Sequence, residues 1–257
     1  MRSESLFSLE NKVAFVSGAS SGLGLHMAEV LAEAGAAVVM AARRQDRIKA
    51  AVSDLTSKGY RAYGVYLDVT RSNTIAAAFN AAEDLSGAQV DVLINNAGIL
   101  YSEKFLNQEE EQITNIFDTN LKGAFLVAQE GGRRMSKAGA GSIVNIASTA
   151  GLRAGATMAS YGAAKAALMH LTRIAALELA GKDVRVNTLC PGNFDSNMQK
   201  VFEEKGFTET LLRRTPQRRF GKLGDLDGAL LLLASGAGRY MTGTVVTVDG
   251  GQSLSWM

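Results

Sequence analysis

Short apolar runs alternate with longer helical segments along almost the whole chain. Each run is continuously apolar, which is typical of a parallel strand buried on both faces. We therefore expect an α/β Rossmann-type fold, with helices on both faces of one doubly wound parallel sheet, in a single domain over residues 1–257. The expected strands are 12–17, 37–41, 61–67, 90–94, 141–147, 184–189 and 242–248, and the expected helices are 25–34, 71–86, 109–135, 161–179 and 225–235.

A glycine-rich turn, Gly18-Ala-Ser-Ser-Gly22-Leu-Gly24, separates the first strand from the first helix. Glycine adopts positive φ at little cost and lets the backbone approach a ligand closely. The start of the helix presents unpaired N–H groups and a positive dipole end to a pyrophosphate. Strand, turn and helix together predict a dinucleotide site.

Two arginines, Arg43 and Arg44, follow the second strand, and no carboxylate occurs until Asp46. A carboxylate at this point would pair with the adenine ribose hydroxyls and repel a 2′-phosphate, whereas arginine binds that phosphate. We therefore expect NADP(H) as the preferred cofactor, with Arg43 as the first contact and Arg44 in support. NAD(H) stays possible.

The stretch from Ser148 to Lys165 carries the candidate chemistry. Tyr161 and Lys165 are four positions apart at the start of a helical segment, so their side chains project from one face. A free phenol has a pKa of about 10, and a nearby ammonium is expected to bring it toward the range of a general acid/base. Ser148 is expected at the carboxyl end of a strand, where open α/β sheets bind ligands. The alternative is an ordinary helix with a surface tyrosine and lysine.

Other polar residues also fall near strand ends or interrupt a helix. Asp68 either accepts a hydrogen bond from adenine or caps the helix at 71–86, for which we expect a Ser or Thr cap. The small residues at 97–98 leave room for a ribose. Asn120, with Gly123 one turn later, is expected to bend the helix at 109–135 or admit a water that relays protons.

Residues 193–221 are the polar exception to the alternating pattern, with many charges and no apolar run. A long segment beside the end of a strand suits a substrate lid, although a solvated surface loop explains the composition almost as well. The arginines at 213–219 either attract an anionic substrate group or form a solvated face.

The composition is that of an ordinary soluble protein: 47% hydrophobic, 20% charged, with a formal net charge of +2. It does not suggest nucleic acid binding, and no apolar run is long enough for a signal peptide or a membrane span, so we expect a cytoplasmic protein. Cys190 is the only cysteine, which excludes an internal disulfide and fits a small buried side chain. His26 and His170 lack a second ligand at metal spacing, so no metal is expected.

Taken together, these motifs resemble the classical short-chain dehydrogenase/reductase family over nearly the whole chain. The resemblance rests on Ser17-Gly18-Ala-Ser-Ser-Gly22-Leu-Gly24, Asp68-Val69, Asn95-Asn96-Ala97-Gly98, Asn120, Ser148, Tyr161-Gly-Ala-Ala-Lys165 and Pro191-Gly192.

The resemblance implies a role for each candidate residue. Tyr161 is the general acid/base, Lys165 lowers its pKa and holds the nicotinamide ribose, Ser148 polarises the carbonyl and Asn120 anchors a water relay. The family also implies a seven-stranded sheet and commonly a homotetramer, assembled through the long helices and the last strand. The residues implied at the cofactor are Gly18, Ser20, Ser21, Gly22, Leu23, Gly24, Arg43, Arg44, Asp68, Val69, Asn96, Ala97, Gly98, Tyr161, Lys165, Pro191, Gly192, Phe194 and Ser196.

Three positions depart from the family pattern. Ser17 and Ser196 replace common threonines but keep a hydroxyl. Ser21 stands where many NADP-dependent members carry a basic residue, which weakens the NADP(H) prediction.

The expected function is an NADP(H)-dependent carbonyl reductase that also runs as a secondary-alcohol dehydrogenase on a small-molecule substrate. The alternatives are an NAD-dependent alcohol dehydrogenase, a 3-oxoacyl-acyl-carrier-protein reductase, and, from another class, a non-catalytic NADP-binding sensor.

Overall fold

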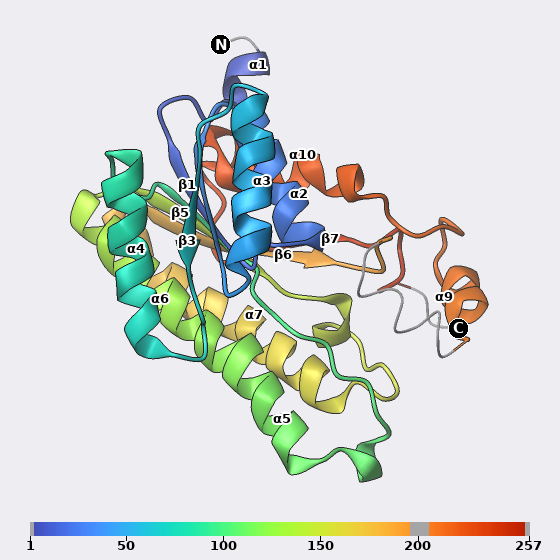
Figure 1. Ribbon diagram of the computed structural model, residues 1–257. Coiled ribbons are helices and arrows are strands. Elements are labelled where there is room, and N and C mark those ends of the chain that lie inside the picture. Colours follow the sequence, from blue (N-terminus) through green and yellow to red (C-terminus); the bar gives the residue numbers. More distant parts are fainter. Residues whose placement is uncertain (1–2, 196–205, 255–257) are drawn as a thin grey trace.

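Seven strands form one sheet in the order β3-β2-β1-β4-β5-β6-β7, and every neighbouring pair is parallel (Figure 1). The structure is a computed structural model that describes residues 3–195 and 206–254. It confirms the expected doubly wound parallel sheet. The strands are β1 Val13–Ser17, β2 Ala37–Ala42, β3 Ala62–Tyr66, β4 Val92–Asn95, β5 Gly141–Ile146, β6 Val184–Pro191 and β7 Val245–Val248.

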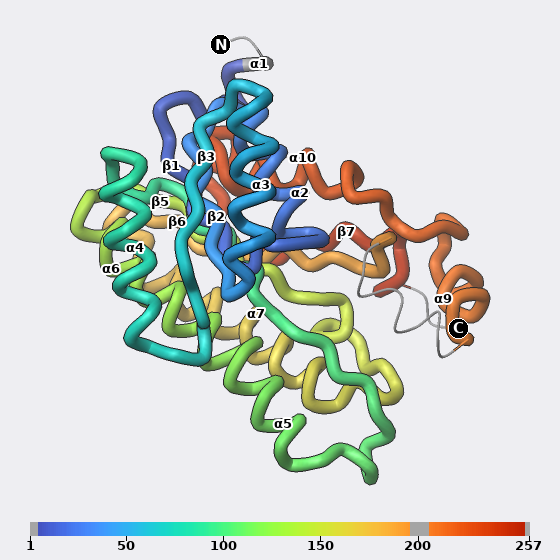
Figure 2. The backbone as a smooth tube through the Cα atoms, in the orientation of Figure 1, coloured from blue at the N-terminus to red at the C-terminus, as the bar shows by residue number. Residues whose placement is uncertain are grey.

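Helices cover both faces of the sheet, as the backbone trace in Figure 2 also shows. On one face lie α2, α3 and α10, and on the other α4, α6 and α7. The helices are α1 Ser3–Leu6, α2 Gly22–Glu33, α3 Gln45–Ser57, α4 Ser72–Ser86, α5 Glu110–Phe117, α6 Ala124–Ala138, α7 Ala159–Leu179, α9 Thr208–Arg214 and α10 Asp227–Ala234.

Successive side chains of β1 alternate between the two faces. Ala14 and Val16 pack on the side of α2 and α10, whereas Val13 and Phe15 pack on the side of α4. There the ring of Phe15 stacks on Phe79, with 4.5 Å between the ring centroids. Because both faces are buried, the strand is apolar from Val13 to Val16, which explains the continuous runs in the sequence.

The order of the strands reverses between β1 and β4, which are neighbours in the sheet although three helices separate them along the chain. Open α/β sheets bind ligands in the crevice at the carboxyl ends of such strands. Ser17 at the end of β1 joins this strand to the residues that follow β4. Its Oγ accepts hydrogen bonds from the N–H groups of Asn96 and Ala97, each at 3.0 Å.

The long helix expected at 109–135 is three elements: α5, a π-helical turn Asp118–Gly123, and α6. The expected bend around Asn120 is therefore present as a π-helical turn, a feature that is frequent at functional sites.

Two details of the helices differ from expectation. Helix α3 was not predicted: its only fully buried side chains are Ile48 and Leu55, and two such positions give a weak signal. The expected Ser or Thr cap of α4 is wrong: Arg71 precedes the helix, and no side chain caps it. Thr74 instead accepts a hydrogen bond from the Asp68 N–H at 3.2 Å.

The segment at 193–221 contains more regular structure than its composition indicated. It includes α9, and an isolated bridge pairs Phe194 with Gly221. Residues 196–205, which include Ser196, lie outside the described residues. The substrate lid therefore stays a prediction.

Within residues 3–195 and 206–254, no helix combines the length and the apolar character needed to cross a membrane.

Candidate active site

Two glycines let the turn after β1 pack against the backbone that follows β4. Gly18 has φ +69°, and a Cβ there would lie 2.8 Å from Ala97 Cα. A Cβ on Gly24 would lie 2.3 Å from the carbonyl oxygen of Gly18. No larger side chain fits at either position. The first turn of α2, which begins at Gly22, is thereby free to present its N–H groups to an anion.

A cavity of about 360 Å³ lies over the carboxyl ends of β1 to β4. The structure brings together the first thirteen expected cofactor residues along its walls: Gly18, Ser20, Ser21, Gly22, Leu23, Gly24, Arg43, Arg44, Asp68, Val69, Asn96, Ala97 and Gly98.

The two arginines after β2 are held differently. The Arg44 guanidinium donates hydrogen bonds from Nη2 to Ser20 Oγ at 2.7 Å and to Ser21 Oγ at 2.9 Å. Its Nε also donates to Ser20 Oγ, at 3.2 Å. The Arg43 side chain is exposed at the edge of the same cavity. The positive charge held against the glycine turn is therefore that of Arg44. The sequence had predicted Arg43 as the first contact of the 2′-phosphate and Arg44 only as a supporting one.

Asp68 forms part of the cavity wall, and its carboxylate does not cap α4. Its Oδ1 accepts hydrogen bonds from the Thr70 N–H at 3.1 Å and from Thr70 Oγ1 at 2.8 Å. The helix-capping alternative is wrong, and contact with an adenine amine stays a prediction.

Tyr161 lies in the first turn of α7, and Lys165 lies one turn later. They are 7% and 5% exposed, so the alternative of a surface tyrosine and lysine is wrong. Lys165 Nζ donates to the carbonyl oxygen of Ile146 at 2.8 Å and lies 5.9 Å from the centroid of the Tyr161 ring. The phenol and the amine therefore share one enclosed space beside the end of β5.

Burial dominates the titration of both groups. It raises the pKa of Tyr161 above its ordinary value, and a hydrogen bond with the Ser148 side chain opposes that rise. Burial also lowers the pKa of Lys165 to about 8. The expected lowering of the phenol pKa is therefore wrong for this structure, because loss of solvent outweighs the hydrogen bond. Ser148 is the group that favours the phenolate.

Asn120 joins this space to the cavity. Its Oδ1 accepts from the Ile99 N–H and its Nδ2 donates to the Ile99 carbonyl, both at 2.8 Å. A Cβ on Gly98 would lie 3.2 Å from Asn120 Oδ1 and 3.6 Å from Lys165 Nζ. Gly98 also lines the larger cavity. Asn120 and Lys165 therefore lie at the end of that cavity, next to Tyr161 and Ser148.

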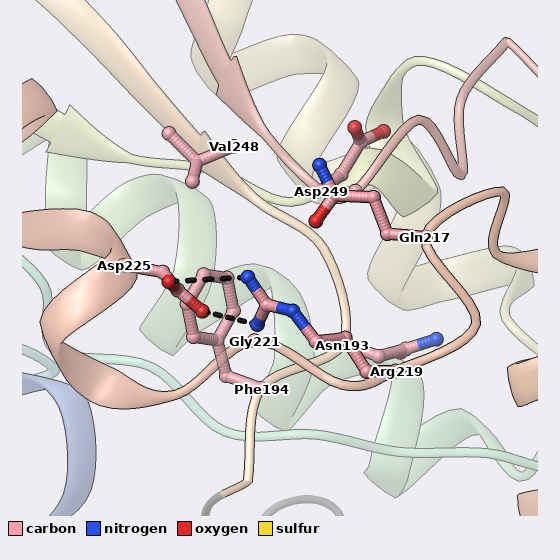
Figure 3. Close-up of a pocket in the computed structure, with 9 residues that line it drawn as sticks. Asn193, Phe194, Gln217, Arg219, Gly221, Asp225, Val248 and Asp249 are labelled. Atoms are coloured by element: carbon pink, nitrogen blue, oxygen red, sulfur yellow. Dashed lines mark hydrogen bonds and ion pairs between the residues drawn. The ribbon is translucent and has the colours of Figure 1, made fainter.

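The residues after β6 lie around a second, smaller cavity of about 200 Å³ (Figure 3). Phe194 forms part of its wall, beside the ion pair between Arg219 Nη1 and Asp225 Oδ2 at 2.5 Å. Neither Pro191, which is buried at the end of β6, nor Gly192 lines the larger cavity. The expected contacts of this turn with nicotinamide therefore stay predictions.

Cys190 and His26 lie outside the larger cavity and contribute to packing and to contacts between helices. Burial raises the pKa of the Cys190 thiol to about 12, which keeps it protonated and fits a small buried side chain. His26 Nε2 lies 2.7 Å from Asp227 Oδ1 and so links α2 to α10.

Comparisons with known proteins agree with this geometry. A family model described as enoyl-(acyl carrier protein) reductase matches residues 18–253. The chain is 37% identical to the 3-oxoacyl-acyl-carrier-protein reductase of Vibrio cholerae over 246 residues, which is 96% of this chain and 99% of the relative. It belongs to the short-chain dehydrogenase/reductase family.

Two gluconate dehydrogenases are similar over the same extent. The gluconate 5-dehydrogenase of Gluconobacter oxydans is 35% identical over 251 residues, covering 97% of this chain and 98% of that protein. A crystal structure of a gluconate 5-dehydrogenase from Burkholderia cenocepacia in complex with NADP and tartrate has a TM-score of 0.94 and 32% identity. It covers 98% of this chain and 99% of that chain.

Sequence reasoning missed five residues of the cavity in this short-chain dehydrogenase/reductase. Four are chain neighbours of predicted ones, so extending each motif by one residue would have found them; the fifth adjoins Asn120 in the π-helical turn. They are Ala42, Leu67, Thr70, Ile99 and Thr119.

Proposed function

We propose that this short-chain dehydrogenase/reductase is an NADP(H)-dependent oxidoreductase that interconverts a ketone and a secondary alcohol. One observation carries the proposal: a buried phenol, a hydroxyl and an amine lie together beside Gly98, at the end of the cavity that the glycine turn forms. Tyr161, Ser148 and Lys165 supply these groups. Gly98 lies between them and the cavity.

The residues of the larger cavity fit a dinucleotide. The Gly18 and Gly24 positions have no room for a side chain, and the start of α2 offers N–H donors for a pyrophosphate. The complex of the Burkholderia cenocepacia relative with NADP supports the same cofactor here.

Arg44 supports NADP(H) over NAD(H). Ser21 occupies a position where many NADP-dependent relatives carry a basic residue, but the Arg44 guanidinium lies 2.9 Å from Ser21 Oγ and restores a positive charge there. Arg43 remains free to turn its side chain toward a 2′-phosphate at the cavity edge. Two guanidinium groups beside the glycine turn suit a phosphate, and the carboxylate of Asp68, which lines the same cavity, accepts its hydrogen bonds from Thr70.

Each group of the cluster has a proposed task. The bound nicotinamide supplies or accepts the hydride, and Tyr161 passes the proton to or from the substrate oxygen. Ser148 holds that oxygen and, through its hydrogen bond to the phenol, lowers the cost of forming phenolate. Lys165 holds the nicotinamide ribose and offers a positive charge to the phenolate. Asn120 anchors the path of the proton to solvent.

The test is the loss of NADPH absorbance with a panel of carbonyl compounds, repeated with NADH. The panel includes ketones, β-ketoesters, a 3-oxoacyl thioester and 5-ketogluconate, the last two chosen from the names of the relatives. We expect turnover with at least one carbonyl and a preference for NADPH. Tight NADPH binding without any turnover would instead identify a non-catalytic sensor.

We also propose that the chain assembles as a homotetramer through its long helices. Large apolar side chains are exposed on α6 and α7, including Phe125 at 41%, Ile174 at 44% and Leu177 at 83%. Light scattering coupled to size exclusion measures the assembly directly, and a monomer at micromolar concentration would contradict the proposal.

A further inference from the structure

Thr157 has an unusual backbone conformation four residues before Tyr161. Its φ is +67°, in the left-handed region that β-branched residues avoid. Such a conformation is energetically unfavourable and persists only where the surroundings impose it, most often near functional sites. The contacts that impose it therefore indicate what the strain maintains.

Those contacts come from the segment Ser102–Gln108, which follows β4. Ser102 Oγ and Thr157 Oγ1 are 2.8 Å apart, and the Glu103 N–H donates to the Thr157 carbonyl at 2.9 Å. Ser102 is 8% exposed. Both the side chain and the backbone of Thr157 are thus held by another part of the chain.

Gln108 completes the arrangement at the start of α7. The residue before the helix, Met158, provides no side-chain cap. Gln108 Oε1 accepts from the Ser160 N–H at 3.2 Å, and Gln108 Nε2 donates to the Glu103 carbonyl at 3.1 Å. A distant amide thereby caps the helical turn that carries Tyr161.

The same stretch of chain begins in the dinucleotide cavity. Gly98 lines that cavity, and the next residue, Ile99, is hydrogen-bonded to the Asn120 side chain through both its backbone N–H and its carbonyl oxygen. Ser102–Gln108 follows within a few residues. One continuous segment therefore connects the cavity, the π-helical turn and the first turn of α7.

We propose that Gln108 and Thr157 are positioning residues, and that Ser102–Gln108 clamps the first turn of α7 so that the Tyr161 phenol meets Ser148. This inference rests on the proposed function of Tyr161. Neither Gln108 nor Thr157 lines the dinucleotide cavity, so the clamp acts through Tyr161. Its loss should slow the chemical step and leave cofactor binding unchanged.

Kinetics of Gln108 variants test the clamp. Gln108→Ala removes the cap, and we expect kcat to fall about 10-fold while the NADPH Kd stays within about 2-fold of wild type, because small misplacement of a catalytic group is costly. Gln108→Glu keeps an oxygen for the Ser160 N–H but loses the donor to the Glu103 carbonyl, so its kcat should lie between those of Gln108→Ala and wild type. Asn107→Ala is the matched control, since Asn107 is an exposed neighbouring amide without a side-chain hydrogen bond among the described residues.

Thr157 variants test the strained position separately. Thr157→Gly accepts the positive φ but loses the bond to Ser102, so we expect a lower kcat. Thr157→Ser keeps the hydroxyl and should stay near wild type. A Thr157→Gly enzyme with wild-type kcat would overturn the role of Thr157.

Titration of the Tyr161 phenol tests the clamp without any substrate. Its ionisation is followed by ultraviolet difference absorbance against Tyr161→Phe, in wild type and in Gln108→Ala. We expect a higher midpoint in Gln108→Ala, because displacement weakens the hydrogen bond to Ser148 that opposes burial.

The outcomes separate the clamp from the proposed function. An unchanged midpoint together with an unchanged kcat per NADPH-binding site would reduce Gln108 to a structural role, even if thermal stability fell. A wild-type protein that reduces no carbonyl would end the proposed function, while the phenol titration would still decide the clamp.

Discussion

The two ends of the crevice are built by different means. The dinucleotide end, over β1 to β3, is shaped by glycines and backbone contacts such as that between Gly24 and the Gly18 carbonyl. The catalytic end depends on side chains from separate elements: Tyr161 from α7, Ser148 after β5 and Asn120 from the π-helical turn. A site built from backbone tolerates few substitutions, but its glycines can be recognised in the sequence. A site built from side chains depends on the residues that hold those side chains in place.

The catalytic end should show the largest single effect. Tyr161→Phe removes the proton donor and keeps the ring, so we expect kcat to fall by about 1,000-fold with NADPH Kd unchanged. Tyr101→Phe, in the same apolar cluster, is the control. A Tyr161→Phe enzyme with near wild-type rate would show that the proton comes from elsewhere.

Burial of Lys165 at the catalytic end should lower the free energy of unfolding, by an amount that depends on pH. Its folded pKa of about 8 lies below the ordinary 10.5, so its contribution to stability is present above pH 10.5 and lost as pH falls through 8. At pH 7 the buried ammonium destabilises the fold by on the order of 3 kcal/mol. Lys165→Met should therefore be more stable than wild type in urea at pH 7, and that advantage should shrink toward pH 10.5.

Lys182→Met, which alters an exposed lysine, is the control for this pH dependence. A Lys165→Met gain that does not vary between pH 7 and 10.5 would mean that the lysine binds its proton equally in the folded and the unfolded protein, so that its folded pKa is not lowered.

The dinucleotide end should respond through cofactor choice. Arg44→Ala removes a charged donor, and we expect the preference for NADPH over NADH in kcat/KM to fall about 10- to 30-fold. Arg43→Asp adds repulsion and should shift the preference further toward NADH. Arg47→Ala, on the exposed side of α3, should change nothing. An unchanged ratio in both arginine variants would place the 2′-phosphate on other groups.

The smallest effect is expected at Ser17, which holds the chain segment that runs from the dinucleotide end to the catalytic end of the crevice. Ser17→Ala leaves the N–H groups of Asn96 and Ala97 without their acceptor, and we expect a loss of about 1.5 kcal/mol in the free energy of unfolding. Ser17→Thr keeps the hydroxyl and should restore stability. Urea denaturation measures both, and a fully stable Ser17→Ala would show that water replaces the hydroxyl.

Most of the fold could be predicted because its signals are local. A strand buried on both faces is apolar at most positions, and the turn after β1 must contain glycine where Gly18 has positive φ. Helix α3 escaped prediction because only Ile48 and Leu55 are fully buried. The resemblance implied seven strands, but their order and the π-helical form of the turn at Asp118–Gly123 came from the structure.

The sequence by itself determined most of the elements, the glycine turn after β1 and the candidate pair Tyr161 and Lys165, because spacing along a strand or helix decides which side chains share a face. Only the tertiary structure decided that Arg44 contacts Ser20 and Ser21, that Gln108 caps α7, and that burial raises the pKa of Tyr161. These features depend on contacts between residues far apart in the chain and on the loss of solvent around them, and neither is encoded in any local pattern.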